Sequence, residues 1–232
     1  MSLDYEQAIE LLKSNKQEHV LSFWNALDAE AKDGLLNEIQ SIDFEDIEHM
    51  QRLLSESSGD DGARLKMEPA EVVGVDDFDR ATMIQKGEEL ISAGRVGIIL
   101  VAGGQGSRLG FDGPKGCYPI GPVSDRTLFH IHARKILAME EKYSAQIPFY
   151  VMTSRTNDGP TRKFFEDNDF FGLDADRVIF FTQNMWPALW GDGRLVMERP
   201  DHIFMSPDGH GGLLTALKQR GMLDDMKSRG LR

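Results

Sequence analysis

An unbroken apolar run, VGIILV at residues 96–101, leads directly into a glycine-rich segment. Because the run has the length of a strand and no polar alternation, it predicts a central strand that is buried on both faces of a sheet. The segment LVAGGQGSRLGFDGPKG, at 100–116, holds six glycines, one arginine and one lysine in seventeen positions. Glycines let backbone N–H groups approach a ligand closely, and the two cations indicate that this ligand is anionic.

Strand-length apolar runs and helical segments alternate along the rest of the chain. Further strands are predicted at 147–154 and 177–183, and a short strand within 202–212 enters a second glycine turn. Helices are expected at about 80–93, closed by Gly94; from a cap at Ser124 or Asp125 through Leu128, Ile131 and Ile136; at 160–168; and at 213–220. This order predicts a three-layer α/β domain with a largely parallel sheet.

Ligands of such domains bind beyond the carboxyl ends of the strands. Three segments, 102–116, 183–187 and 207–212, each follow a predicted strand and are polar or rich in glycine. We therefore expect these three segments to converge on one site at that edge of the sheet.

The N-terminal part of the chain differs from the rest. Residues 4–54 are predicted to be helical, and a polar stretch at 55–71 predicts an exposed connection. Apolar side chains at helical spacing include Val20, Phe23, Trp24 and Leu27. Residues 1–79 carry 20 acidic and 6 basic side chains, whereas residues 80–232 carry 18 acidic and 20 basic ones. We predict a helical N-terminal segment with an acidic linker at 1–79 and a separate α/β part at 80–232.

Composition limits the class of protein. The 232 residues, 41% hydrophobic and 28% charged, are typical of a soluble globular protein, and the net charge of −12 argues against nucleic-acid binding. No apolar run approaches the roughly 20 residues that span a bilayer, and MSLDYEQAIELL at the start lacks the pattern of a signal peptide. The single cysteine, Cys117, is interpreted as a packed thiol and favours a cytoplasmic location.

Two familiar phosphate-binding loops do not fit the glycine-rich segment. The dinucleotide fingerprint G-x-G-x-x-G is one residue shorter than the spacing of Gly104, Gly106 and Gly110. Asp125 is at the distance of its ribose-binding acid, but it follows two prolines rather than a strand. The ATPase-type loop needs glycine directly before lysine, whereas Lys115 follows a proline. A dinucleotide-dependent oxidoreductase is therefore disfavoured.

A third pattern fits. A-G-G-x-G-[ST]-R-L-G, followed closely by P-K, resembles the signature loop of nucleotidyltransferases that make nucleotide sugars. Blocks at 23–44, 153–189 and 205–217 resemble, in the same order, motifs of the eukaryotic-type UDP-sugar pyrophosphorylases, and especially of their UDP-N-acetylhexosamine branch. The resemblance implies a Rossmann-like, GT-A-like nucleotidyltransferase domain, incomplete at its C-terminus. Its nucleotide-binding part would cover 80–232, after the helical segment at 1–79.

The resemblance also implies a reaction, in which UTP and N-acetylhexosamine 1-phosphate give UDP-N-acetylhexosamine and pyrophosphate. Arg108 and Lys115 would be catalytic: Lys115 contacts the UTP phosphates, and Arg108 holds the pyrophosphate end. Gln183 matches a glutamine whose amide suits the uracil edge. The residues implied to bind UTP are Val101, Ala102, Gly103, Gly104, Lys115, Gln183 and Gly209.

His210, implied to lie at the sugar phosphate, departs from the pattern of the N-acetylhexosamine enzymes, which usually carry asparagine there. Histidine at this position resembles the glucose-type enzymes, although the flanking Gly211 and Gly212 fit the first group. A UDP-glucose or other UDP-sugar pyrophosphorylase is therefore an open alternative. His130 and His132 lie within a predicted helix and are expected to be structural.

The family implies Mg²⁺ as a cofactor, with its aspartate ligand expected beyond Arg232. Asp224 and Asp225 are adjacent on a predicted helix and are not predicted to bind the ion. We expect residues 1–232 alone to bind UTP without completing the reaction, with UTP and a sugar 1-phosphate as the partners of the enzyme. A truncated, non-catalytic module that binds uridine nucleotides is the other open alternative.

Overall fold

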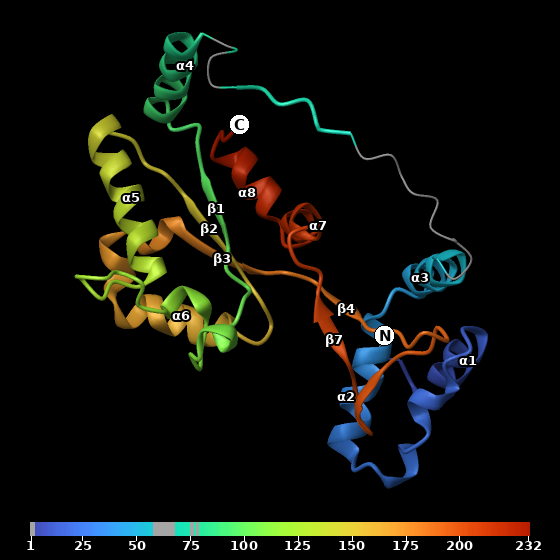
Figure 1. Cartoon of the computed structure of the whole chain (residues 1–232). Coiled ribbons are helices and arrows are strands. Elements are labelled where there is room, and N and C mark those ends of the chain that lie inside the picture. The colour runs from blue at the N-terminus through green and yellow to red at the C-terminus, as the bar shows by residue number, and fades with distance from the viewer. Residues whose placement is uncertain (1–2, 58–67, 75–76, 78) are drawn as a thin grey trace. The chain divides into compact units, whose positions relative to one another are not determined.

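The computed structural model describes residues 3–57, 68–74, 77 and 79–232 (Figure 1). They form two compact units. The first unit comprises Met1–Ala70 and Met185–Ser206, and the second comprises Glu71–Asn184 and Pro207–Arg232. Residues 185–206 thus pack with the N-terminal helices, although in the sequence they follow the last strand of the sheet. The division at residue 79 and the extent of the nucleotide-binding part stay predictions.

A parallel sheet of three strands forms the centre of the second unit. The strands are β1 (Ile98–Val101), β2 (Phe149–Thr153) and β3 (Val178–Thr182), in the order β1-β2-β3. All five residues of β2 are buried, whereas Ile99 of β1 is 39% exposed. The expectation for 96–101 is therefore wrong: within the described part of the chain β1 is an edge strand, and β2 is the central one. An apolar run does not indicate which neighbours the strand pairs with, and Ile99 shows that it does not require burial of every side chain.

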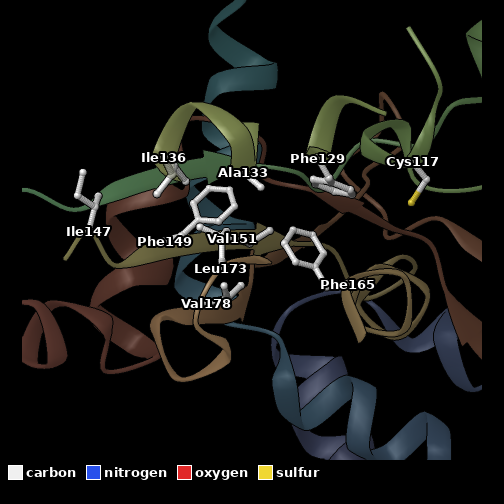
Figure 2. Close-up of a cluster of buried hydrophobic side chains, with 10 residues drawn as sticks. All are labelled: Cys117, Phe129, Ala133, Ile136, Ile147, Phe149, Val151, Phe165, Leu173 and Val178. Carbon is white, nitrogen blue, oxygen red and sulfur yellow. The ribbon is translucent and has the colours of Figure 1, made fainter. Parts of the chain in front are cut away.

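Helices cover both faces of this sheet (Figure 1). On one face lie α4 (Arg80–Ser92), α5 (Leu128–Tyr143) and α6 (Asp158–Asp167); on the other lie α7 (Leu213–Gln219) and α8 (Met222–Ser228). Alternate residues of β2 serve the two faces. Phe149 and Val151 pack among the side chains of α5 and α6, as Figure 2 shows, and Tyr150 and Met152 pack against α7 and α8. The predicted three-layer α/β architecture is confirmed.

The helix boundaries follow local chemistry. Asp79 caps α4 by accepting bonds from two backbone N–H groups, and Gly94 ends it at φ +66°, as predicted. The cap of α5 is Thr127, whose side chain accepts from the N–H of His130, and not Ser124 or Asp125. Those two residues lie inside a turn that the N–H groups of Ile120 and Gly121 close onto the carbonyl of residue 126.

The first unit packs short strands against helices. Its helices are α1 (Tyr5–Ser14), α2 (Ala29–Ser41) and α3 (Phe44–Ser57), and its strand pairs are β4 (Met185–Pro187) with β7 (Met205–Pro207) and β5 (Met197–Arg199) with β6 (His202–Ile203). Gln17 is fully buried, donates to the carbonyl of Gly193 and accepts from the N–H of Leu195. These two bonds join the N-terminal helices to the returning segment.

Two details of the first unit differ from the predictions. The stretch with Val20 and Trp24 forms two short 3₁₀ turns, Glu18–Leu21 and Trp24–Ala26, rather than an α-helix. The short strand predicted within 202–212 is two strands, β6 and β7. In the predicted connection at 55–71, residues 55–57 belong to α3, residues 68–71 are exposed, and residues 58–67 lie outside the described residues. No described helix has the length and apolar character that a bilayer crossing requires.

Candidate nucleotide-binding site

Three loops leave the carboxyl edge of the sheet side by side. The N–H of Ala102 donates to the carbonyl of Met152 at 2.7 Å, and the N–H of Gln183 donates to the carbonyl of Thr153 at 2.8 Å. The segments that follow β1, β2 and β3 are therefore held together where the strands end. A fourth segment joins them, because the N–H of Asp208 donates to the carbonyl of Asn184 at 3.2 Å.

This arrangement confirms the predicted convergence of the loop after β1, the end of β3 and the turn at 207–212. It does not extend to the whole of 183–187, because residues 185–187 form β4 in the first unit. The site that can be described within the second unit therefore includes Gln183 and Asn184 from this segment.

Gln183 lies face-on against Gly103. A Cβ atom on Gly103 would lie 2.6 Å from Nε2, 2.9 Å from Cδ and 3.0 Å from Oε1 of Gln183, so any side chain there would displace the amide. Gln183 is only 5% exposed, and its side chain forms no hydrogen bond with any described residue. A nearly buried amide without a partner is costly unless a ligand supplies one.

The glycine-rich loop folds back on itself as a narrow hairpin. The N–H of Gly106 donates to the carbonyl of Gly113 at 2.8 Å, and the N–H of Lys115 donates to the carbonyl of Gly104 at 3.0 Å. The fold-back places Nζ of Lys115 3.8 Å from the position of a Cβ on Gly104. The structure thus brings Lys115 to the same part of the loop as Gly103 and Gly104.

The two cations of the loop are available to a ligand. Arg108 lies in a 3₁₀ turn, Ser107–Leu109, and both it and Lys115 are exposed. Neither forms an ion pair with a residue that the structure describes. In the same loop, the N–H groups of Gly103, Gly104 and Gln105 donate to no described acceptor. Three successive free N–H groups next to a lysine are suited to an anion such as phosphate.

Not every glycine of the loop serves a ligand. A Cβ on Gly116 would lie 2.1 Å from the ring of Phe129, so this glycine is required by packing in the core. Gly104 is exposed, and the nearest atom to its Cβ position is at ordinary contact distance. No contact among the described residues therefore requires glycine at 104, and the role predicted for Gly104 stays a prediction.

Asn157 was missed in the sequence analysis. It is fully buried between β2 and α6, and its Nδ2 donates to the carbonyls of Ala102 at 2.9 Å and Gly104 at 3.3 Å. Its side chain therefore ties the turn after β2 to the glycine-rich loop. The available signal was a polar residue soon after a predicted strand, which is also typical of an ordinary helix cap.

The turn at Pro207–Gly212 holds two candidate residues. Gly209 takes φ +63°, and His210 is exposed. Asp208 packs its carboxylate on the Cα of Gly212, where Oδ1 is buried without a hydrogen bond from any described group, and burial raises its pKa. The roles predicted for Gly209 and His210 stay predictions, as do those for Val101 and Ala102.

The residues interpreted as structural lie where expected. Cys117 is 9% exposed, and burial raises the pKa of its thiol to about 11, so it is a packed thiol. His130 and His132 lie on α5, and burial is the main cause that lowers the pKa of both side chains. Within the described ranges no three His, Cys, Asp or Glu side chains are grouped to hold a metal ion.

Fold and loop together define an α/β protein with a glycine-rich loop, carrying two exposed cations, at the carboxyl edge of its sheet. The family model described as UTP–glucose-1-phosphate uridylyltransferase matches residues 44–232. The chain belongs to this family. It is 37% identical to UDP-N-acetylglucosamine diphosphorylase 2 of Arabidopsis thaliana, over 98% of this chain. It is 38% identical to UDP-N-acetylhexosamine pyrophosphorylase-like protein 1 of Homo sapiens, over 93% of this chain.

A solved structure gives the same assignment. The crystal structure of the UDP-N-acetylglucosamine pyrophosphorylase from Trypanosoma brucei, in complex with an inhibitor, superposes with a TM-score of 0.76 and 27% identity over 97% of this chain. The chain covers 48% of the Arabidopsis relative, 46% of the human relative and 49% of the trypanosomal protein. It thus spans about half the length of the relatives that it matches.

Proposed function

We propose that this chain is the UTP-binding part of a uridylyltransferase that makes UDP-N-acetylhexosamine and pyrophosphate from UTP and N-acetylhexosamine 1-phosphate. Membership of the family and the names of the relatives support the reaction class. The observation that carries the proposal is the amide of Gln183, nearly buried on Gly103 and without a partner among the described residues.

Uracil would satisfy that amide. The Watson–Crick edge of uracil presents an N–H donor between two carbonyl acceptors, and the Gln183 side chain offers one acceptor and two donors. Backbone groups of Val101, Ala102, Gly103 and Gly104 would line the nucleotide on one side, and that of Gly209 would contact the base. Adenine presents a different order of donors and acceptors, so we expect the site to prefer UTP to ATP.

The phosphates would be held by Lys115, Arg108 and the free N–H groups of the loop. In the proposed reaction an oxygen of the sugar phosphate forms a bond with the α-phosphorus of UTP, and the bond from that phosphorus to the leaving pyrophosphate breaks. Two cations and backbone dipoles near the phosphates would stabilise the negative charge that shifts to the leaving group.

No three His, Cys, Asp or Glu side chains among the described residues are grouped so that they could hold the predicted Mg²⁺. Asp225 accepts hydrogen bonds from Tyr150 and Arg229, and Asp224 is paired loosely with Lys227 at the surface. With these partners, the two carboxylates do not fit as ligands of an octahedral cation. Mg²⁺ as a cofactor stays a prediction.

The identity of the sugar rests on the relatives. Their names favour N-acetylhexosamine, whereas His210 favours glucose. A binding module without catalysis is the second candidate function, because the contacts proposed for UTP need no sugar phosphate site among the described residues. The cytoplasm is the location that the single cysteine, Cys117, favours.

Calorimetry on the chain tests the proposal. We expect saturable binding of UTP at least about tenfold tighter than that of ATP, since one unsatisfied polar group costs about 1–3 kcal/mol. Gln183→Leu should remove the preference, and Gln219→Leu, an exposed glutamine at the end of α7, is the matched control. Equal affinities for UTP and ATP would exclude the uracil site.

A pyrophosphate-release assay tests for catalysis. Turnover would exclude the binding module, and a preference between N-acetylglucosamine 1-phosphate and glucose 1-phosphate would identify the sugar. UTP binding without turnover is the result expected of residues 1–232 under both candidate functions.

A further inference from the structure

We propose that Asn157 is a positioning residue that sets the free N–H groups of the glycine-rich loop for the nucleotide, an inference that rests on the proposed function. Asn157 stands at the N-cap of α6, where asparagine usually bonds a backbone N–H of the first helical turn. Its side chain makes no such bond. The helix therefore does not use the side-chain capping capacity of this residue.

All hydrogen-bonding capacity of this amide is directed elsewhere. Its Oδ1 accepts from the N–H of Ser154 at 2.8 Å and from the hydroxyl of Ser154 at 3.0 Å. Its Nδ2 donates to the carbonyls of Ala102 at 2.9 Å and Gly104 at 3.3 Å. The oxygen end is thus fixed to the turn after β2, and the nitrogen end reaches the loop after β1.

The two carbonyls that Asn157 holds lie on either side of Gly103. In a trans peptide the C=O and the N–H point in opposite directions. Drawing the carbonyl of Ala102 towards Asn157 therefore turns the N–H of Gly103 away from it, and the bond to the carbonyl of Gly104 does the same for the N–H of Gln105. Both N–H groups donate to no described acceptor.

The four hydrogen bonds of Asn157 need both an acceptor and a donor in one buried side chain, so not every polar residue can replace it. Aspartate has nearly the same shape and could still accept from Ser154, but it offers no donor to the two carbonyls and opposes their partial negative charge. Serine is a good helix cap and is too short to reach the loop. Asn157→Asp and Asn157→Ser therefore remove the loop contact in two different ways.

The matched control is Asn168→Asp at the other end of α6. Asn168 is exposed, and its Nδ2 donates to the carbonyl of Phe164 at 2.8 Å within the same helix. The control has the same chemical change and the same added charge without contact to the loop. Thermal unfolding by circular dichroism identifies the temperature below which each variant is folded, and Asn157→Ser serves if Asn157→Asp does not fold.

Two measurements on the unlabelled and ¹⁵N-labelled chain test the role. In spectra without ligand, the amide signals of Gly103 and Gln105 should shift or broaden in both Asn157 variants and stay in place in Asn168→Asp. By calorimetry, UTP should bind about tenfold or more weakly to the Asn157 variants and within about twofold of the wild type to the control.

Each outcome is decisive. Unchanged signals of Gly103 and Gln105 in the Asn157 variants would overturn the positioning role, whatever UTP does. Shifted signals with unchanged UTP affinity would overturn its importance for the nucleotide. A wild-type chain with no saturable UTP binding would instead overturn the proposed function, and with it the role in nucleotide binding.

Discussion

Gly103 and Gln183, eighty positions apart in the sequence, are in direct contact across the carboxyl ends of β1 and β3. The space that a Cβ on Gly103 would need is occupied by the side-chain amide of Gln183, whose Nε2 is 2.6 Å from that position. The glycine therefore has a steric reason that is independent of any ligand. It allows a nearly buried amide to lie flat at the end of the sheet with its polar atoms available.

Gly103→Ala should displace this amide and weaken UTP binding by about tenfold or more, because its hydrogen bonds to the base would be misplaced. Calorimetry of the folded variant measures the loss. Gly87→Ala, in the middle of α4 with no atom within 4 Å of its Cβ position, is the matched control. We expect that control to keep the affinity and to gain about 0.5–1 kcal/mol of stability. If Gly103→Ala binds UTP with wild-type affinity, Gln183 does not form hydrogen bonds with the base.

Lys115→Met should weaken binding of UTP and leave binding of uridine unchanged, because uridine lacks the phosphates that the ammonium group would contact. The exposed side chain has no ion pair with a described residue, so the melting temperature should stay the same. Lys163→Met, which removes a surface pair with Asp167, is a control for loss of one positive charge. Equal losses for UTP and uridine would mean that Lys115 acts on the loop and not on phosphate.

Much of the fold could be predicted because it rests on local patterns. The strands expected at 147–154 and 177–183 match β2 and β3 within two residues at each end, and Gly94 ends α4 as its position suggests. The pairing order could not be predicted, since the apolar runs of β1 and β2 look alike in sequence. The return of 185–206 to the N-terminal helices depends on distant contacts such as those of Gln17.

The candidate site was predictable where residue type alone indicates chemistry. Glycines, a lysine and an arginine in one loop predict an anion site. In the structure the side chain of Lys115 lies near Gly104, and that of Gln183 lies against Gly103. Asn157 was not predictable in this way, because asparagine before a helix is ordinarily a cap. Its role depends on which carbonyls lie within reach of its nitrogen, and that information exists only in the folded chain.

Cys117 should react slowly with iodoacetamide at pH 8 in the native chain and rapidly in guanidinium chloride. Only the thiolate reacts, and burial raises the thiol pKa to about 11 from an ordinary value of 9.0. Mass spectrometry of the alkylated chain measures both rates. Because the pKa is higher in the folded chain, the thiol's contribution to the free energy of unfolding is fully present below pH 9.0. It is lost as the pH rises from 9.0 to about 11. Native and unfolded rates that are equal would contradict a packed thiol.

Tyr150→Phe tests the contact that fixes α8 to the sheet. The hydroxyl of Tyr150, a fully buried residue of β2, donates to Oδ2 of Asp225 at 2.6 Å, and Nε of Arg229 donates to the same oxygen at 2.9 Å. The variant keeps the ring and loses one bond to a carboxylate, which should lower the free energy of unfolding by about 1–3 kcal/mol at pH 7. Urea unfolding measures this difference. Tyr143→Phe loses the hydrogen bonds of its hydroxyl with Glu88 and Lys142, which are more exposed than Tyr150; it should cost less and is the control.

The pH dependence of the Tyr150→Phe effect identifies Asp225 as the partner. Burial alone would raise the pKa of Asp225, but the hydrogen bonds from Tyr150 and Arg229 outweigh it and hold this pKa below its ordinary value of 3.8. A lowered folded pKa means that the contact stabilises the native state above that ordinary value and loses its effect as the pH falls through the folded pKa. Urea unfolding at pH 7, 5 and 3 should therefore show an undiminished difference between wild type and variant at the first two values and a smaller one at the third. A difference that stays constant down to pH 3 would show that Tyr150 stabilises the chain by packing and not through the ionised carboxylate of Asp225.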